Sequence, residues 1–404
     1  MYFVRYHYTL NVSLGQAFHE KKVKKSVLLL RTVEEYAIII GNNLKRRETE
    51  KIMKLLHIAD LHLGSELSTR LTAEKARRRK DELCDAFDRA VTYAKQEGVH
   101  AILLSGDVFD GAAIYRRDKQ FFYDVIRHTP QITFFYLKGN HDKEEGEEDL
   151  PNLKTFSSDG WTSYDLGEGV CVSGIELSPQ NSEGYYDTLR LDEGKKNIVL
   201  LHGQLSESVG ASKIVLRKLA GKGIDYLALG HIHAYSTGAI DARGSYAYAG
   251  CLEPRGFDEV GEKGFILLDT EGGLHHRFVE SALRTVRLVE VNISGVSGMS
   301  EAQYKVEEAL TVAKEDMPRI LLKGEVDFNT DGIEYFVSQR LKEKYFALSV
   351  KDETSPALHL EKYEGQVSLE AEFVRVILAD VALDDAEKKR VIALGLKALK
   401  GEKL

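Results

Sequence analysis

The chain has 404 residues, of which 43% are hydrophobic, with 55 lysines and arginines against 63 aspartates and glutamates and a net charge of −8. This length fits one large domain and a smaller one, and the hydrophobic content excludes a generally disordered chain. The net charge excludes a uniformly basic nucleic-acid coat, although a local basic groove stays open. No apolar run approaches the roughly 18 residues of a membrane span, so we expect no membrane segment.

The first 52 residues differ from the rest of the chain. They show no regular alternation of strands and helices, and they contain the basic run Lys45-Arg46-Arg47 shortly before Met53 and a strong strand. Two interpretations stay open: residues 1–52 are an N-terminal extension, or they are upstream sequence and Met53 is the true start.

From Met53 onward, apolar strands alternate with amphipathic helices. The pattern predicts strands at 54–60, 101–106 and 132–138, with helices at 72–97 and 116–128 between them. Such units place parallel strands beneath helices. The pattern continues with short strands around 163–177, strands at 197–202 and 225–230, a helix near 211–221, and strands within 245–282.

A change of pattern near residue 284 predicts further units. Helices at 300–315 and 331–344 and strands at 319–326 and 345–352 indicate a small α+β domain. Two amphipathic helices follow between residues 368 and 400, the second starting with Asp384 as N-cap and Glu387 at the capping-box position. The predicted domains are therefore 1–52, 53–283, 284–355 and 356–404.

Five short polar motifs follow apolar strands of the large domain. Because the carboxyl ends of strands in open α/β sheets converge on one crevice, the five motifs can build one site. They are Asp60-Leu61-His62, Gly106-Asp107-Val108-Phe109-Asp110, Gly139-Asn140-His141-Asp142, His202-Gly203 and Gly230-His231-Ile232-His233.

The spacing within two of these motifs suits metal binding. In an extended segment the side chains at i and i+2 point the same way, so Asp60 and His62 can reach one ion together. The same argument applies to His231 and His233. The carboxylate of Asp107 has two oxygens and can bridge two ions.

The donor atoms also indicate which metals fit. Asn140 offers a neutral oxygen and His202 an imidazole, so the set contains nitrogen and oxygen but no sulfur. Such a set suits Mn, Fe, Zn or Mg, with Mn or Fe favoured over a zinc thiolate site. Two ions about 3.5–4 Å apart can activate a hydroxide for attack on phosphorus.

Each motif alone has an ordinary explanation. A single histidine at a strand end is most often a hydrogen-bonded structural residue, and an aspartate there is commonly the N-cap of the next helix. Five motifs in this order are hard to obtain by chance, so a metal site is favoured. His57 lies inside a strand and is predicted to be structural.

The five motifs resemble those of the calcineurin-like metallophosphoesterases in identity, order and approximate spacing, over residues 53–280. The resemblance implies an α/β sandwich of four layers, with two mixed sheets flanked by helices. It implies one metal bound by Asp60, His62, Asp107 and His233, and a second bound by Asp107, Asn140, His202 and His231. His141 would face the scissile phosphate as a general acid or hydrogen-bond donor, oriented by Asp110.

Other features resemble SbcD-type DNA repair nucleases, in particular their shorter YhaO-like bacterial branch. Residues 58–64 are similar to the opening of these nucleases, and residues 249–265 to the stretch after their last histidine motif. The capping α+β domain and the C-terminal helices match their architecture. The resemblance implies an exonuclease, often also an endonuclease, in which a metal-bridging hydroxide attacks DNA. The two ions would be Mn²⁺, with Fe²⁺, Mg²⁺ and Zn²⁺ as alternatives.

The same resemblance implies partners. It implies a homodimer that works with an SbcC-type coiled-coil ATPase, for which residues 368–400 are the candidate contact; an ordinary helical hairpin is the alternative. Arg255 is a candidate for binding DNA, as are Arg77 and Arg78 in the basic run that also includes Arg79. A solvated helix face is the alternative for that run.

Two other functions stay open. One is a metallophosphoesterase acting on small nucleotides, cyclic nucleotides or phosphoproteins. The other is a mainly non-catalytic subunit that regulates an ATPase, although such a subunit should have lost at least one ligand.

The three cysteines, Cys84, Cys171 and Cys251, lack the spacing of a disulfide framework, so we expect a cytoplasmic protein.

Overall fold

The computed structural model of the chain describes residues 52–67, 71–111, 116–143, 148–399 and 401. Apart from Ile52, the predicted extension 1–52 lies outside these residues, so both interpretations of it stay predictions. The residues from Met53 onward belong to one unit of the chain.

Six strands form the first sheet, in the order β14-β13-β1-β2-β3-β4. The strands β1 to β4 run parallel, as their alternation with helices predicts, while β13 pairs antiparallel with both β1 and β14. The sheet is therefore mixed. Its strands are β1 (Lys54–Ile58), β2 (Ala101–Ser105), β3 (Thr133–Leu137), β4 (Leu153–Thr155), β13 (Gly264–Asp269) and β14 (His275–Glu280).

The second sheet also has six strands, in the order β11-β12-β10-β7-β6-β5. The four inner strands run parallel, and an antiparallel strand closes each edge. Its strands are β5 (Thr162–Gly167), β6 (Val170–Gly174), β7 (Lys196–His202), β10 (Tyr226–Gly230), β11 (Ser236–Ala239) and β12 (Ser245–Tyr248).

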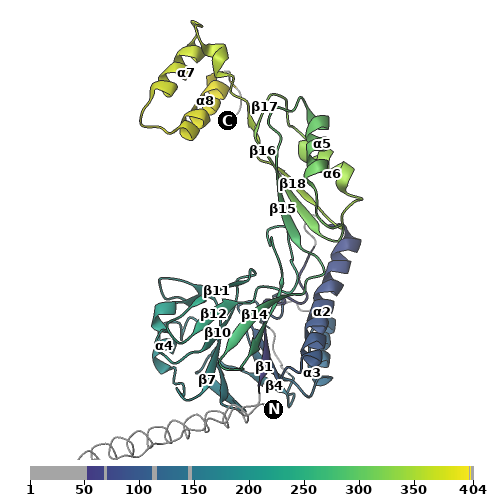
Figure 1. Cartoon of the computed structure of the whole chain (residues 1–404), viewed down its shortest axis with the longest axis vertical. Coiled ribbons are helices and arrows are strands. Elements are labelled where there is room, and N and C mark those ends of the chain that lie inside the picture. Colours follow the sequence, from purple (N-terminus) through teal and green to yellow (C-terminus); the bar gives the residue numbers. More distant parts are fainter. Residues whose placement is uncertain (1–51, 68–70, 112–115, 144–147, 400, 402–404) are drawn as a thin grey trace, which may run out of the picture. The chain divides into compact units, whose positions relative to one another are not determined.

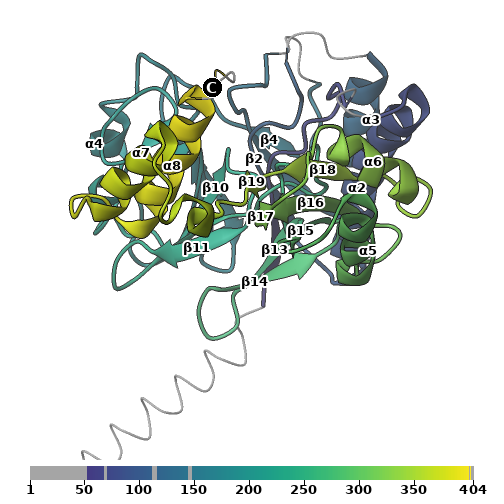
Figure 2. The same ribbon diagram turned by 90° about the horizontal axis from the view of Figure 1, so that it is seen from above.

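The central strands are apolar on both faces because a packed layer covers each face. Leu55 of β1 joins Ile198 of β7 in the core between the two sheets. Leu56, which points the opposite way, joins the core beneath α2 (Ala73–Gln96) and α3 (Arg116–Arg127). The short α4 (Tyr185–Thr188) packs on the outer face of the second sheet. Figures 1 and 2 show this order of helix, sheet, sheet and helix, and the predicted four-layer fold is confirmed.

The predicted helix near 211–221 is wrong. Lys213–Ile214 form the short strand β9 beside β8 (Gln204–Leu205), and only Leu216–Lys218 make a turn of 3₁₀ helix, η1. The apolar residues of this segment have helical spacing, yet Ile214, Val215 and Leu219 pack into the core on the second sheet without forming a helix. Its carbonyl groups at Ser212 and Ile214 instead accept hydrogen bonds from the β8 segment.

An α+β arrangement follows β14, as the sequence predicts. Three parallel strands enclose a small core with two helices. The first helix ends at Ala309, earlier than predicted. The elements are β15 (Val286–Asn292), α5 (Met299–Ala309), β16 (Met317–Lys323), α6 (Ile333–Leu341) and β18 (Ser349–Asp352), with the small pair β17 (Glu325–Val326) and β19 (Ser355–Pro356). The domain boundaries at 283/284 and 355/356 stay predictions.

Two helices follow the short 3₁₀ helix η2 (Leu360–Tyr363), namely α7 (Leu369–Ala379) and α8 (Asp385–Leu399). The predicted capping box is confirmed: the Glu387 amide donates to Asp384 Oδ1 at 2.8 Å, and the Asp384 amide donates to Glu387 Oε2 at 3.0 Å. Among the described residues, no helix combines the length and apolarity needed to cross a bilayer.

Candidate active site

The carboxyl ends of five strands, three from the first sheet and two from the second, carry the five polar motifs. Asp60 follows β1, Asp107 follows β2, Asn140 follows β3, His202 ends β7 and His231 follows β10. The backbone joins neighbouring ends, because the His62 amide donates to the Asp107 carbonyl at 2.9 Å. The structure therefore brings all five motifs to one place.

The backbone at this site is strained rather than extended. Asp60, His62, Asp107 and His231 have φ angles of 52°, 47°, 51° and 99°, in the left-handed region that non-glycine residues seldom adopt. The sequence predicted that Asp60 and His62 point the same way because their segment is extended. Their side chains do lie in one group, but the segment is not extended, because both residues have positive φ angles.

Two glycines make room for these ligand side chains. A Cβ atom at Gly106, whose φ is 90°, would lie 2.2 Å from Nδ1 of His202. A Cβ atom at Gly230 would lie 1.9 Å from the Ser105 carbonyl oxygen and 2.9 Å from the same imidazole nitrogen. Only glycine allows β2 and β10 to approach the His202 ring this closely.

The first group of side chains that could hold a metal ion consists of Asp60, His62 and His233, whose candidate ligand atoms all lie within 4.8 Å of one another. The Nε2 atoms of His62 and His233 are 3.1 Å apart. Burial lowers the pKa of His62 to about 4, so this imidazole is neutral at pH 7 and keeps a lone pair that could bind a metal ion.

The second group consists of Asp107, His202 and His231, joined by Asn140. Asn140 Oδ1 lies 3.1 Å from both His202 Nε2 and His231 Nδ1, and Asp107 Oδ2 lies 3.2 Å from His202 Nε2. The same Asp107 oxygen is 3.9 Å from His62 Nε2. Asp107 thus faces both groups, whereas His231 and His233, which the spacing argument assigned to one ion, belong to different groups.

Contacts outside the two groups fix which imidazole nitrogens are available. His202 Nδ1 donates to the Ser105 carbonyl at 2.9 Å, and His233 Nδ1 donates to Glu259 Oε1 at 2.7 Å. Their Nε2 atoms therefore face the groups, as in histidines that bind metal ions. Imidazole nitrogens and carboxylates that converge in this way fit divalent cations, and a bound ion would displace the proton that His202 shares with Asp107.

Burial also shapes the charges of the carboxylates. Desolvation raises the pKa of Asp60 to about 6, although His202 and His233 oppose the rise. Burial would also raise the pKa of Asp107, but the hydrogen bond from His202 has the larger effect and lowers that pKa. Burial would lower the pKa of His202, but the same hydrogen bond raises it. Without metal, Asp107 and His202 thus form a buried ion pair.

His141 and Asp110 lie beside the first group. His141 Nδ1 is 2.9 Å from Asp110 Oδ1, and the His141 amide donates to Asp107 Oδ1 at 2.8 Å. The neighbouring His62 ring and the Ser65 hydroxyl hold the pKa of Asp110 below its ordinary value despite partial burial. The His141 side chain is 44% exposed, so it can meet a substrate from solvent.

Of the three predicted DNA-binding arginines, Arg255 alone contacts the site in the described part of the chain. Its Nη2 lies 3.2 Å from His233 Nδ1, and its Nη1 lies 3.4 Å from Asp110 Oδ2. Arg77 is exposed and lines a separate cavity of about 390 Å³ with Leu67 and Lys80. Arg78 instead donates to Glu82 at 3.2 Å.

The predicted interpretations of the basic run, as a DNA-binding face or a solvated helix face, are both wrong for Arg79. Its side chain is buried and donates to Glu82, to Glu253 at 3.1 Å and to the Pro254 carbonyl at 2.7 Å. A buried and fully engaged guanidinium does not contact a DNA backbone. This residue therefore has a structural role.

Two site residues were not predicted from the sequence. The buried Asp142 carboxylate accepts hydrogen bonds from the amides of Val108, Phe109 and Gly139 at 3.3, 2.7 and 2.9 Å. It thereby ties the loop after β3 to the loop after β2. Its place next to His141 was a usable signal, and Glu259 lies in the stretch 249–265 that the resemblance marked without giving this residue a role.

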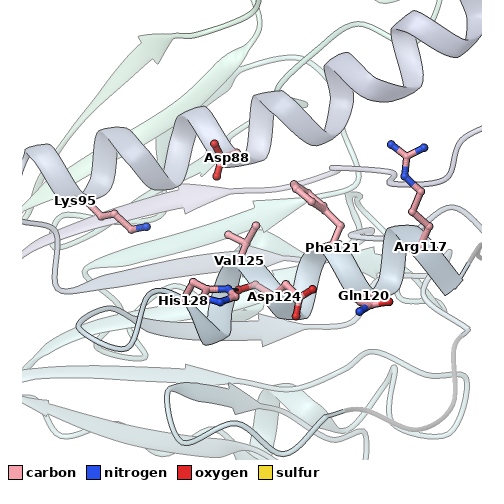
Figure 3. A pocket seen from close by; sticks show the side chains of 8 residues that line it. All are labelled: Asp88, Lys95, Arg117, Gln120, Phe121, Asp124, Val125 and His128. Carbon is pink, nitrogen blue, oxygen red and sulfur yellow. Dashed lines mark hydrogen bonds between the residues drawn. The ribbon is translucent and has the colours of Figure 1, made fainter.

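A cavity of about 460 Å³ lies between α2 and α3 and is separate from the two groups of ligands. Figure 3 shows that its walls come from these two helices and carry charges of both signs. Its lining residues are Asp88, Lys95, Arg117, Gln120, Phe121, Asp124, Val125 and His128. None of the predicted site residues contributes to it.

Comparisons with known proteins show which family the sequence resembles. Residues 53–235 match the family model of calcineurin-like phosphoesterases. The chain is 25% identical over 301 residues to the DNA double-strand break repair protein Mre11 of Sulfolobus acidocaldarius, covering 69% of this chain and 77% of that protein. It is 25% identical over 298 residues to the uncharacterized metallophosphoesterase YhaO of Bacillus subtilis, covering 67% and 72%.

A second Mre11 protein, from Thermoplasma acidophilum, is 23% identical over 369 residues, covering 83% of this chain and 92% of that protein. Among solved structures, a dimetal phosphatase from Danio rerio is similar at 11% identity and a TM-score of 0.37, covering 54% and 92%.

Proposed function

The chain carries a calcineurin-like metallophosphoesterase domain, and from this premise we propose that it is a two-metal phosphodiesterase that degrades DNA as a repair exonuclease. The observation that carries the proposal is the pair of adjoining ligand groups that share Asp107. The proposed substrate rests on the similarity to the Mre11 repair proteins, which extends beyond the phosphoesterase domain.

We assign the residues roles from their contacts. Asp60, His62, Asp107 and His233 would hold one ion, and Asp107, Asn140, His202 and His231 the other. Bound divalent ions supply positive charge for the phosphate oxygens and for activating water. His141 holds the proton for the leaving oxygen, and Asp110 orients its ring by accepting the Nδ1 proton.

We propose Mn²⁺ as the metal, because the donor set is mixed nitrogen and oxygen without thiolate. Fe²⁺, Mg²⁺ and Zn²⁺ are the alternatives.

The three cysteines are free thiols, which supports a reducing compartment, and the cytoplasm is our proposal.

For partners we propose DNA, a second copy of the chain and an SbcC-type coiled-coil ATPase. The ATPase contact would be the helices α7 and α8. Leu369, Val376 and Leu394 on these helices are 69%, 57% and 46% exposed. Such apolar exposure on an amphipathic helix pair supports a docking surface for a partner helix.

The test is hydrolysis of end-labelled linear DNA by the full chain with Mn²⁺, beside His141→Ala and with bis(p-nitrophenyl) phosphate as a small diester. We expect progressive shortening of the DNA, which the variant loses. Hydrolysis of the small diester with intact DNA would favour a small-nucleotide substrate. Inactivity toward both substrates, from protein that holds two Mn²⁺, would contradict the proposal.

A further inference from the structure

The stretch after β12 surrounds His233 at both its backbone and its ring. Lys263 Nζ, on a side chain that is only 2% exposed, donates to the His233 carbonyl at 2.9 Å. On the other side, Glu259 Oε1 accepts the His233 Nδ1 proton at 2.7 Å. Both partners lie in the glycine-rich stretch whose role in the chemistry is otherwise unassigned.

Both oxygens of Glu259 are engaged. Oε1 also lies 3.4 Å from Arg255 Nε, while Oε2 accepts the Arg255 amide at 2.8 Å and faces Cys251 Sγ at 3.4 Å. The guanidinium held in this way reaches Ser65 Oγ at 3.2 Å and Asp110 Oδ2 at 3.4 Å. One carboxylate therefore connects a candidate metal ligand with the acid that orients His141.

We propose that Glu259 is a positioning residue, which fixes His233 with its Nε2 lone pair toward the first ligand group and holds Arg255 against Asp110. This inference rests on the proposed function, because it assigns His233 to a metal ion. It also gives Arg255 a local role, since its guanidinium is bound between two site carboxylates.

The physical basis is the tautomer of His233. A carboxylate beside Nδ1 keeps the proton there, leaves Nε2 unprotonated and makes the ring a better donor to a metal ion. Losing such a partner weakens metal binding about 10–100-fold in comparable sites.

The experiment measures Mn²⁺ binding to the full chain by isothermal titration calorimetry for wild type, Glu259→Ala and Glu259→Gln. Glu262→Gln is the matched control, because Glu262 belongs to the same stretch but is exposed and pairs with Arg287 at 3.7 Å. The rise in melting temperature on adding Mn²⁺ is a second readout, which does not require activity.

We expect Glu259→Ala to weaken one of the two Mn²⁺ sites about 10–100-fold and to reduce the Mn²⁺-dependent rise in melting temperature. Glu259→Gln, which keeps an oxygen acceptor, should lose less, and Glu262→Gln should match wild type. Unchanged Mn²⁺ affinity in a folded Glu259→Ala variant would overturn this inference but not the proposed function. If the alanine variant does not fold, unchanged affinity in Glu259→Gln would do the same. Failure of the wild type to bind Mn²⁺ would overturn the proposed function and the inference with it.

Discussion

Single side chains define this site through their hydrogen-bond partners. His202 and His233 each donate one ring proton outward, to a carbonyl and to a carboxylate, and so present the other nitrogen inward. His141 has the same kind of partner in Asp110, but its side chain remains 44% exposed. Among these three histidines, exposure separates His202 and His233, which would hold metal, from His141, which would meet substrate.

His141→Ala is predicted to slow hydrolysis of bis(p-nitrophenyl) phosphate about 10²–10⁴-fold, the usual effect of losing a general acid. The Mn²⁺ content should stay as in wild type, because His141 is not among the proposed ligands. Steady-state kinetics and metal analysis of the same samples check both statements. His128→Ala, at an exposed histidine directly after α3, is the control, and equal loss in both variants would contradict the assigned role.

Asp142→Ala is predicted to lower the free energy of unfolding by about 3 kcal/mol, because it leaves buried backbone amides without an acceptor. Urea denaturation measures the change. Asp149→Ala, at an exposed residue on the same connection, should change stability by less than about 0.5 kcal/mol. Equal stability of Asp142→Ala and wild type would show that its three amides find other partners.

The meeting of the candidate ligands at the strand ends could be predicted because their signal is local. Each is a polar residue directly after an apolar strand, and the parallel arrangement of the strands brings such ends together. Glu259 could not be predicted, because its partner His233 lies 26 positions away and on a different segment. The strained φ angles of Asp60 and His62 were equally hidden, since the sequence pattern of an extended segment is the same.

At the level of elements, a buried ion network ties α2 to the segments that precede and follow β15. Arg284 donates to Glu82 at 2.7 Å and to the Glu315 carbonyl at 2.8 Å, and its guanidinium lies 3.7 Å from the centre of the Phe346 ring. Arg79 completes the network from α2. The network explains why the basic run on α2 is only partly a surface feature.

Glu82→Gln is predicted to destabilise the protein by about 3 kcal/mol at pH 7, because it leaves two buried arginines undercompensated. Burial would raise the pKa of Glu82, but the bonds from Arg284 and Arg79 lower it below the ordinary 4.5. A lowered folded-state pKa gives stability that is present above pH 4.5 and is lost as the pH falls through the folded-state value.

The measurement is urea denaturation of wild type and Glu82→Gln at several pH values between 3 and 7. The difference between them should be largest above pH 5 and should shrink toward pH 3. A difference that does not depend on pH would mean that the Glu82 carboxylate is not held ionised by its arginines.

The element boundaries show where sequence patterns lose information. The strands and helices from 54 to 138 were predicted because each has a clear apolar period. The segment 211–221 was mistaken because its buried residues also fit a helix, while its carbonyls pair with β8. Arg79 was mistaken because sequence alone does not show which arginine of a run meets buried carboxylates.

At the scale of the whole molecule, the two sheets pack face to face, and the carboxyl ends of strands from both sheets meet at the site. The first group takes Asp60 and His62 from the first sheet and His233 from the second, and the second group draws on both sheets as well. Bound divalent ions would therefore crosslink the two sheets. The order of strands in the second sheet, β11-β12-β10-β7-β6-β5, depends on pairings that the sequence pattern did not reveal.

Metal removal is therefore predicted to destabilise the protein. Chelation with EDTA should lower the melting temperature, and Mn²⁺ should restore it, because a ligand that binds only the folded state stabilises that state by mass action. Differential scanning calorimetry with and without Mn²⁺ tests this. A melting temperature that is insensitive to Mn²⁺ would mean that the ion does not join the two sheets.

The most direct test of the two-metal site is the number of Mn²⁺ ions bound per chain, measured by calorimetry and elemental analysis for wild type and Asp107→Ala. Two ions in the wild type and severe loss of both in the variant are predicted, because Asp107 Oδ2 faces His202 at 3.2 Å and His62 at 3.9 Å. A wild type that binds at most one ion, or an Asp107→Ala variant that keeps two with unchanged affinity, would contradict the account.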